Sequence, residues 1–280
     1  MSLDESKIME ELSCLREEVR RLRKALNQQA PRLSILLQRR GFKIYKKEPM
    51  ECILIPTKRY LKVYYRMFHK YSFRLFLRDV IKHQHLITLE KVIRYAAPSV
   101  TRQYLNCMVA MKLIKKNEQT YSLTSGPIKS FGETLEWYVA EVFKREFASE
   151  AAWGIKFKRS GVGGDYDVIA ACEGALLYVE VKSSPPKQIY DNEIAAFLDR
   201  VDDLSPEIAI FLMDTELRMK DKIVPMFEKE LANRHSNANH TLRLKRELFQ
   251  VQNNIFIMNA KESIIRNIET VVHWYYTKQI

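Results

Sequence analysis

Residues 160–184 read SGVGGDYDVIAACEGALLYVEVKSS, and this stretch decides the fold of the 280-residue chain. Two apolar runs flank the dipeptide Glu173-Gly174, which suits the two-residue turn of a β-hairpin. If this dipeptide forms the turn, Cys172 lies opposite Ala175, and that pair fixes every further pair of the two strands. The stretch therefore predicts two antiparallel strands that are apolar enough for the interior of a sheet.

Three carboxylates and one lysine fall on one face of the expected hairpin. The register places Asp167 opposite Glu180. It also places Asp165 opposite Lys182, and side chains two residues apart on a strand share a face. Directly opposed Cβ atoms are only ~4.5–5.5 Å apart, and carboxylates that close repel each other unless a proton or a cation lies between them. We therefore expect a hard divalent cation, Mg²⁺ (or Mn²⁺), with the lysine beside it to orient an attacking water or hold a phosphate.

The same residues resemble a known family of nucleases. Asp167, followed on the next strand by Glu180-Val181-Lys182, resembles the PD-(D/E)xK nuclease superfamily. The glycine-rich run that leads into Asp167 is similar to that of the Mrr-like restriction endonucleases and the archaeal Holliday-junction resolvases. The residue before Asp167 is Tyr166 rather than the proline of the family name. Asp165 is a second candidate for the motif aspartate, and Asp167 is preferred because Val-Ile follows it.

The resemblance implies a metal-dependent DNA endonuclease with a restriction-endonuclease-like fold, a three-layer α/β/α domain. Such enzymes commonly take a further glutamate from the preceding helix, and Glu136 lies on the apolar stripe of the helix expected at 132–147. Many members also carry a polar residue after the Glu-x-Lys strand, for which Gln188 is the candidate. The implied catalytic residues are Asp167, Glu180, Lys182, Glu136 and Gln188, and the implied metal ligands are Asp167, Glu180 and Glu136.

Strands and helices alternate through the rest of this half of the chain. Apolar runs and helical periodicity predict strands near 153–159, 166–172, 176–182, 207–213 and 254–258 and helices near 187–203, 216–232 and 261–277. Such alternation predicts an α/β domain with helices on both faces of its sheet. We place this domain at residues 129–280.

The net charge of +12 comes from the middle of the chain. Residues 31–130 contain 21 basic and 5 acidic residues, whereas residues 1–30 are neutral and residues 131–280 carry a net charge of −4. A charge concentrated in this way indicates a local polyanionic partner. The expected partner is DNA, duplex or branched, and RNA stays open as an alternative.

The basic segment, 31–128, is expected to be a mostly helical domain. Helices over 71–83, over 89–95 and from the N-cap Ser99 onward precede two short strands around Asn117-Glu118, and a further short strand is expected at 52–56. Three helices and a basic hairpin resemble a winged helix-turn-helix, which implies base contacts from the third helix and backbone contacts from the hairpin. A winged helix that binds a protein stays open. The nucleic-acid-binding candidates are Arg102, Gln103, Asn106, Lys115 and Lys116.

Residues 1–30 are a coiled-coil candidate. Their apolar residues recur at spacings of 4, 3, 4, 3 and 4, which is the a/d seam of a heptad repeat: Ile8, Leu12, Leu15, Val19, Leu22 and Leu26. Fewer than three heptads are present, so the helix either dimerises the chain or packs on its own domain. The first possibility predicts a homodimer.

Composition excludes several other classes of protein. Hydrophobic residues make up 46% and charged residues 29%, which indicates a globular rather than a disordered chain. No apolar run approaches the ~18 residues that span a bilayer, and the four cysteines lie far apart, so we expect a cytoplasmic protein of a prokaryotic type with no membrane partner. The alternative function is a DNA-binding regulator that uses an inactive nuclease fold as a scaffold.

Overall fold

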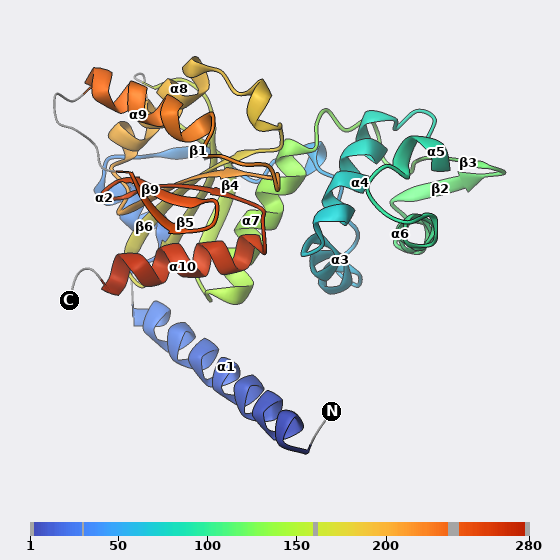
Figure 1. Cartoon of the computed structure of the whole chain (residues 1–280), viewed down its shortest axis with the longest axis horizontal. Helices are drawn as coiled ribbons and strands as arrows, with labels where there is room; N and C mark the ends of the chain where they lie inside the picture. The colour runs from blue at the N-terminus through green and yellow to red at the C-terminus, as the bar shows by residue number, and fades with distance from the viewer. Residues whose placement is uncertain (1–2, 30, 159–161, 235–240, 278–280) are drawn as a thin grey trace.

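The computed structural model describes residues 3–29, 31–158, 162–234 and 241–277, and it shows an α/β protein with a helical unit at one side (Figure 1). The expected Ser160-Gly161 start of the glycine-rich run therefore lies outside the described residues, as does the side chain of Leu26. Within the described ranges, no helix is long and apolar enough to cross a membrane.

An eight-stranded sheet forms the larger part of the chain. Its strand order is β1-β4-β5-β6-β7-β10-β9-β8, and the pairing is antiparallel except that β7 lies parallel to both β6 and β10. The strands are β1 (Ile44–Lys46), β4 (Glu150–Phe157), β5 (Tyr166–Cys172), β6 (Ala175–Lys182), β7 (Ile208–Met213), β8 (Leu242–Lys245), β9 (Leu248–Gln252) and β10 (Ile255–Asn259).

Helices cover both faces of this sheet. α7 (Gly132–Glu146) and α10 (Ile264–Thr277) share one buried core with β-strand residues such as Val168 and Val179. α2 (Leu33–Arg39), α8 (Asp191–Leu204) and α9 (Ile223–Arg234) share the other core, with residues such as Ile169 and Tyr178. Figure 1 shows α8 and α9 above the sheet and α10 below it. Alternate residues of β5 and β6 thus face opposite helical layers, as the strand period requires.

The hairpin predicted from residues 160–184 is confirmed. β5 and β6 pair from Val168 with Val179 to Cys172 with Ala175. Glu173 and Gly174 form the turn with φ angles of 51° and 87°, the conformation that a tight two-residue hairpin turn needs. The ladder stops one residue before Asp167, so the strands separate at the position where the carboxylates begin.

The helical unit contains α3 (Leu61–Phe68), α4 (Tyr71–Lys82), α5 (Leu89–Val92), α6 (Pro98–Ala110) and the hairpin β2 (Ile114–Asn117) to β3 (Thr120–Leu123). Ile87, between α4 and α5, forms an isolated bridge with Tyr121 of β3. The core of this unit is continuous with that of α7, where the Phe68 ring stacks on Tyr138 at 5.0 Å between centroids. The unit is therefore packed against the sheet domain through a shared aromatic core.

Two arginines of α4 strengthen this junction. Arg74 Nε lies 2.8 Å from Asp214 Oδ1, and their side chains are only 2% and 1% exposed. Arg78 Nη1 donates to the carbonyl of Ser183 at 2.6 Å. Both acceptors directly follow β7 and β6, so α4 is held to the ends of the two strands that lie parallel in the centre of the sheet.

Several expected boundaries are wrong. Residues 31–46 belong with the sheet rather than with the helical unit, because α2 packs in its core and Ile44 of β1 pairs with Phe157. The strand expected at 52–56 does not form, since Met50–Cys52 is a 3₁₀ turn and the Leu54 amide donates to Thr134 Oγ1 instead of a neighbouring strand. α6 begins at Pro98 with Ala97 as its N-cap, not Ser99, as suits a proline in the first turn. The strands β8 and β9 and the early strand β1 were not anticipated.

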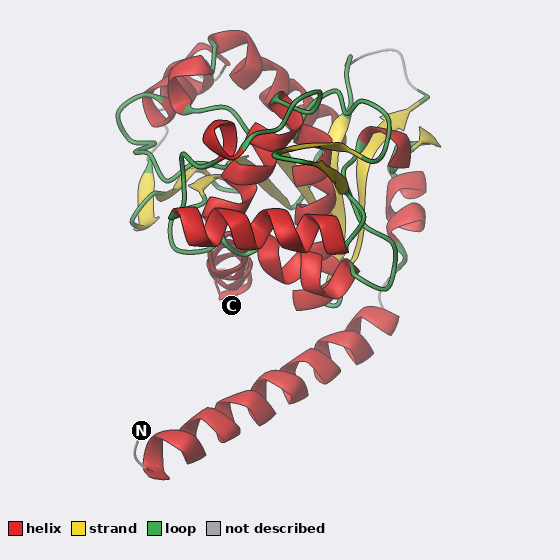
Figure 2. Ribbon diagram, turned by 90° about the vertical axis from the view of Figure 1, so that its right-hand side faces the viewer, coloured by secondary structure: helices red, strands yellow, loops and turns green. Residues whose placement is uncertain are grey.

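The N-terminal helix forms as expected. α1 (Leu3–Gln29) is a single helix of 27 residues. It projects away from the rest of the chain in both views (Figures 1 and 2). The structure does not show α1 packed on its own domain.

Candidate active site

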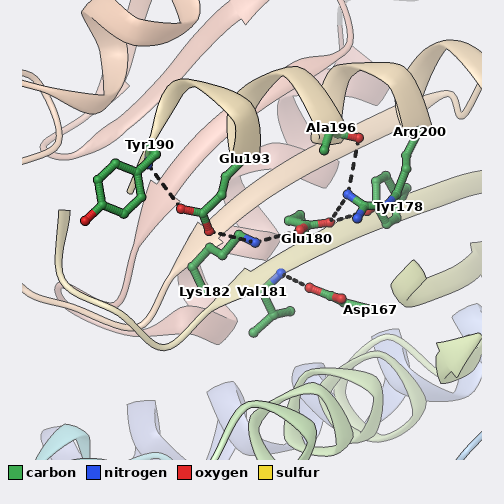
Figure 3. Close-up of polar contacts among 9 residues, drawn as sticks. All are labelled: Asp167, Tyr178, Glu180, Val181, Lys182, Tyr190, Glu193, Ala196 and Arg200. Atoms are coloured by element: carbon green, nitrogen blue, oxygen red, sulfur yellow. Dashed lines mark hydrogen bonds and ion pairs between the residues drawn. The ribbon is translucent and has the colours of Figure 1, made fainter. Parts of the chain in front are cut away.

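The hairpin brings the expected catalytic residues of β5 and β6 together (Figure 3). Lys182 Nζ lies 2.9 Å from Glu180 Oε1. The backbone amide of Val181 donates to Asp167 Oδ2 at 2.7 Å, so the carboxylate takes the place that a strand carbonyl would occupy. Glu180 is almost fully buried and Lys182 is partly buried, which strengthens the electrostatic interactions among these groups.

Glu136 lies on α7, in the other helical layer, and approaches β4. Its Oε2 lies 3.9 Å from the position that a Cβ atom would take on Gly154 of β4, so the glycine leaves room for the carboxylate. Burial, followed by the negative charges of Asp167, Glu133 and Glu180, raises the pKa of Glu136 to about 10. The predicted fourth carboxylate is therefore in the electrostatic field of the hairpin site.

Asp167 and Glu136 are the two carboxyl groups near the site whose pKa values are raised. Burial and then the charge of Glu180 raise the pKa of Asp167 well above its usual range, although the Val181 amide opposes this effect. Carboxyl groups with raised pKa values suit a hard divalent cation, because oxygen donors are its preferred ligands and its charge favours their ionised form. In the described part of the chain, however, no three His, Cys, Asp or Glu side chains are gathered closely enough to form a ready metal site.

Helix α8 supplies two contacts that the sequence interpretation does not include, and β6 supplies a third. Arg200 Nη1 lies 3.3 Å from Glu180 Oε2, and Glu193 Oε1 lies 3.2 Å from Lys182 Nζ. Tyr178 of β6 lies two residues before Glu180 on the same face of the strand, and it donates its hydroxyl to Glu180. The spacing carries a signal for both residues, since Glu193 and Arg200 are seven apart and each directly precedes a residue of the buried stripe of α8.

The glycine-rich run allows the arginine to approach. Gly164 has a φ of +99°, and a Cβ built on it would lie 3.0 Å from Arg200 Nη2. A larger residue would therefore meet both backbone strain and a steric contact. Arg200 also donates to the carbonyl of Ala196 at 3.2 Å, and its Nε is buried with no hydrogen-bond partner among the described residues.

Two expected site residues are not brought to the hairpin site. Asp165 precedes β5, and its Oδ1 lies 2.8 Å from Lys156 Nζ rather than beside Lys182. Asp167 is thus the aspartate that shares the site with Glu180. Gln188 is exposed in the 3₁₀ turn Pro186–Gln188, and its backbone amide donates to Pro185. The partner of the lysine comes from α8 instead.

The nucleic-acid-binding candidates lie on the helical unit. Figure 1 shows α6 and β2 on the side of the chain away from β6. All five side chains are exposed there, three on α6 and two on β2: Arg102, Gln103, Asn106, Lys115 and Lys116.

No protein-family model matches this chain, and no curated protein matches it. The solved structures similar to it include Can2 from Sulfobacillus thermosulfidooxidans in complex with cyclic tetra-adenylate, at 15% identity and a TM-score of 0.49 over 87% of this chain and 60% of that one. They also include protein VC1899 from Vibrio cholerae, at 12% identity and a TM-score of 0.48 over 89% of this chain and 61% of that one. The chain therefore spans about three fifths of the length of these two proteins.

Proposed function

We propose that the chain is a metal-dependent nuclease that hydrolyses DNA phosphodiester bonds. The observation that carries this proposal is the group formed by Asp167, Glu180 and Lys182 at the open end of one hairpin. Glu136 of α7 is near enough for the charge of Asp167 to raise its pKa. Paired carboxylates and a lysine are the groups that hold a divalent cation and a phosphate in phosphodiester hydrolysis.

The order of elements supports a restriction-endonuclease-like core. α7 precedes the antiparallel strands β4, β5 and β6, and α8 then leads to β7, which lies parallel to β6. The motif aspartate lies on the second strand of this meander and the Glu-x-Lys on the third, as the family resemblance implies. The upstream glutamate comes from the helix that the resemblance indicates.

The helical unit supports a winged-helix arrangement. Three helices, α4 to α6, are followed by a basic hairpin. Ile87 forms an antiparallel bridge with Tyr121 of β3, so a short third segment lies against this hairpin. The exposed basic and amide side chains of α6 and β2 are the groups that bind bases and phosphates. In this proposal the unit holds the DNA, and the hairpin site cuts it.

Each residue of the site then has a chemical role. Asp167, Glu180 and Glu136 would hold Mg²⁺ or Mn²⁺ only by moving closer together, because no three such side chains among the described residues form a ready metal site. The cation would supply a more acidic water and stabilise negative charge on the phosphate. Burial by itself would lower the pKa of Lys182, but Glu180, Asp167 and Glu193 outweigh burial and raise it. Lys182 is therefore a cation at neutral pH, and it holds the negative charge of the phosphate.

Cleavage by the variant Lys182→Ala tests this role. We expect the wild-type chain to cleave duplex, branched or single-stranded DNA with Mg²⁺ or Mn²⁺. The variant should lose cleavage and keep its affinity for DNA, whereas Lys187→Ala, an exposed lysine of the following turn, should retain both. Absence of cleavage by the pure wild-type protein on every substrate would refute the proposal.

One observation favours a DNA-binding regulator with an inactive nuclease fold as a second candidate. Glu180 already has three partners, Tyr178, Lys182 and Arg200, so its carboxylate is neutralised without a metal. A regulator predicts DNA binding that does not depend on Mg²⁺ and is unchanged in Lys182→Ala, with no turnover. A filter-binding titration with and without chelator, run beside the cleavage assay, separates the two.

A further inference from the structure

Helix α1 presents an uncovered apolar seam. Its described seam side chains are between 42% and 62% exposed: Ile8, Leu12, Leu15, Val19 and Leu22. The helix projects from the body in both views, and no other described segment lies along it (Figures 1 and 2). Most helices in proteins gain their stability from packing of such a face. The seam of α1 is therefore an apolar surface that a partner helix would cover.

The charged residues beside the seam indicate which partner helix, in which orientation, the seam can bind. With Leu12 and Val19 at a positions, Glu11 and Glu18 occupy g positions, and the sequence has arginine at the e positions 16 and 23. In a parallel, in-register pair, each g residue faces the e residue of the next heptad on the other helix, so glutamate meets arginine. In an antiparallel pair, g faces g and e faces e, so like charges meet.

We propose that α1 pairs with α1 of a second copy of this chain as a parallel, in-register, two-stranded coiled coil. The seam is self-complementary, and the opposite charges of its two flanks match only in the parallel orientation. Val19 at an a position with Leu22 at the following d position is the combination that favours two strands. The helix is about 40 Å long at ~1.5 Å per residue, and both bodies of the dimer lie at its C-terminal end.

Sedimentation equilibrium of the full chain tests the pairing. The wild-type chain should be a dimer, and the double variant Glu11→Arg/Glu18→Arg should self-associate at least roughly tenfold more weakly, because attractive pairs become repulsive ones. The double variant Arg16→Glu/Arg23→Glu should weaken in the same way. An equal mixture of the two should recover the dimer, since the charges again match in a parallel pair.

A disulfide test reads the orientation. In a Cys14→Ser background, Ile8→Cys should cross-link to itself on oxidation, because a parallel pair brings the two copies of this d position together. An antiparallel pair would place residue 8 opposite residue 26, about 27 Å away at ~1.5 Å per residue. Glu10→Cys, at an outward f position, is the matched control and should stay monomeric on a non-reducing gel.

Four results would overturn the proposal: a monomeric or higher-order wild-type chain, no effect of either charge reversal, no recovery in the mixture, or no cross-link through position 8. None of these readouts depends on nuclease activity. The dimer proposal and the proposed function therefore succeed or fail separately.

Discussion

The substitution Glu136→Gln is expected to stabilise the folded chain at neutral and alkaline pH. Burial, and then the charges of Asp167, Glu133 and Glu180, raises the pKa of Glu136 from 4.5 to about 10. Between these values the folded chain keeps a proton that the unfolded chain has released. The free energy of unfolding therefore falls as the pH rises from 4.5 toward about 10. Glutamine has nearly the same shape and no charge, so the variant lacks this contribution.

The magnitude follows from the width of that interval. One pKa unit corresponds to ~1.4 kcal/mol, and pH 7.5 lies about three units above the usual value of 4.5, which gives an upper limit of about 4 kcal/mol. Asp167, whose pKa is also raised, shares the proton uptake of the site. We therefore expect the variant to be about 1–4 kcal/mol more stable than wild type at pH 7.5 and about equal to it near pH 4.5.

Urea unfolding at several pH values between about 5 and 8.5, with a chelator present, measures this difference. Glu269→Gln, on the exposed face of α10, is the matched control and should follow the wild-type curve at every pH. Mg²⁺ should raise the stability of wild type at pH 7.5 and have less effect on Glu136→Gln, because a cation favours the ionised carboxylate. Parallel wild-type and Glu136→Gln curves, or a less stable variant at pH 7.5, would refute the reasoning.

Three further predictions concern other parts of the chain. Arg200→Gln removes the 3.3 Å contact with Glu180, so DNA cleavage should fall by roughly 10–100-fold at unchanged DNA affinity, as single-turnover rates and binding titrations will show. Lys116→Ala on the exposed hairpin should reduce the salt dependence of DNA binding by about one phosphate contact, and an unchanged slope in a salt titration would contradict that role. Phe68→Ala should cost about 3–5 kcal/mol and lower a single unfolding transition in calorimetry, since the core is continuous from the helical unit to the sheet; two separate transitions in wild type would count against that continuity.

The hairpin could be predicted from the sequence because its cause is local. Glu173-Gly174 allowed one tight turn, and the strand period then fixed the register from Cys172 with Ala175 onward. Glu136 was identified from the family resemblance, which implies a glutamate from the preceding helix, together with its place on an apolar helical stripe. The hairpin needed only spacing and side-chain chemistry, whereas Glu136 also needed the resemblance.

Contacts between distant segments could not be predicted in this way. β1 joins the sheet by pairing Ile44 with Phe157, which lies more than a hundred residues away, and no local pattern specifies such a partner. Gln188 was suggested by the family resemblance, which implies a polar residue after the Glu-x-Lys strand, whereas the structure gives the lysine a partner from α8, beside the buried stripe of that helix. Glu193 and Arg200 have the spacing of that stripe, but only the packing of α8 on the sheet shows which side chains it covers.

The helical unit and the sheet domain are held in one fixed arrangement. They share a core at α7, and the α4 arginines bind at the ends of β6 and β7. A protein that recognises DNA with one part and acts on it with another through a flexible tether would cut over a range of positions. Here the aromatic contact and the buried Arg74–Asp214 pair keep the distance between the two parts constant. Under the proposed function, cuts by the hairpin site should therefore fall at a constant number of nucleotides from the sequence or structure bound by the helical unit.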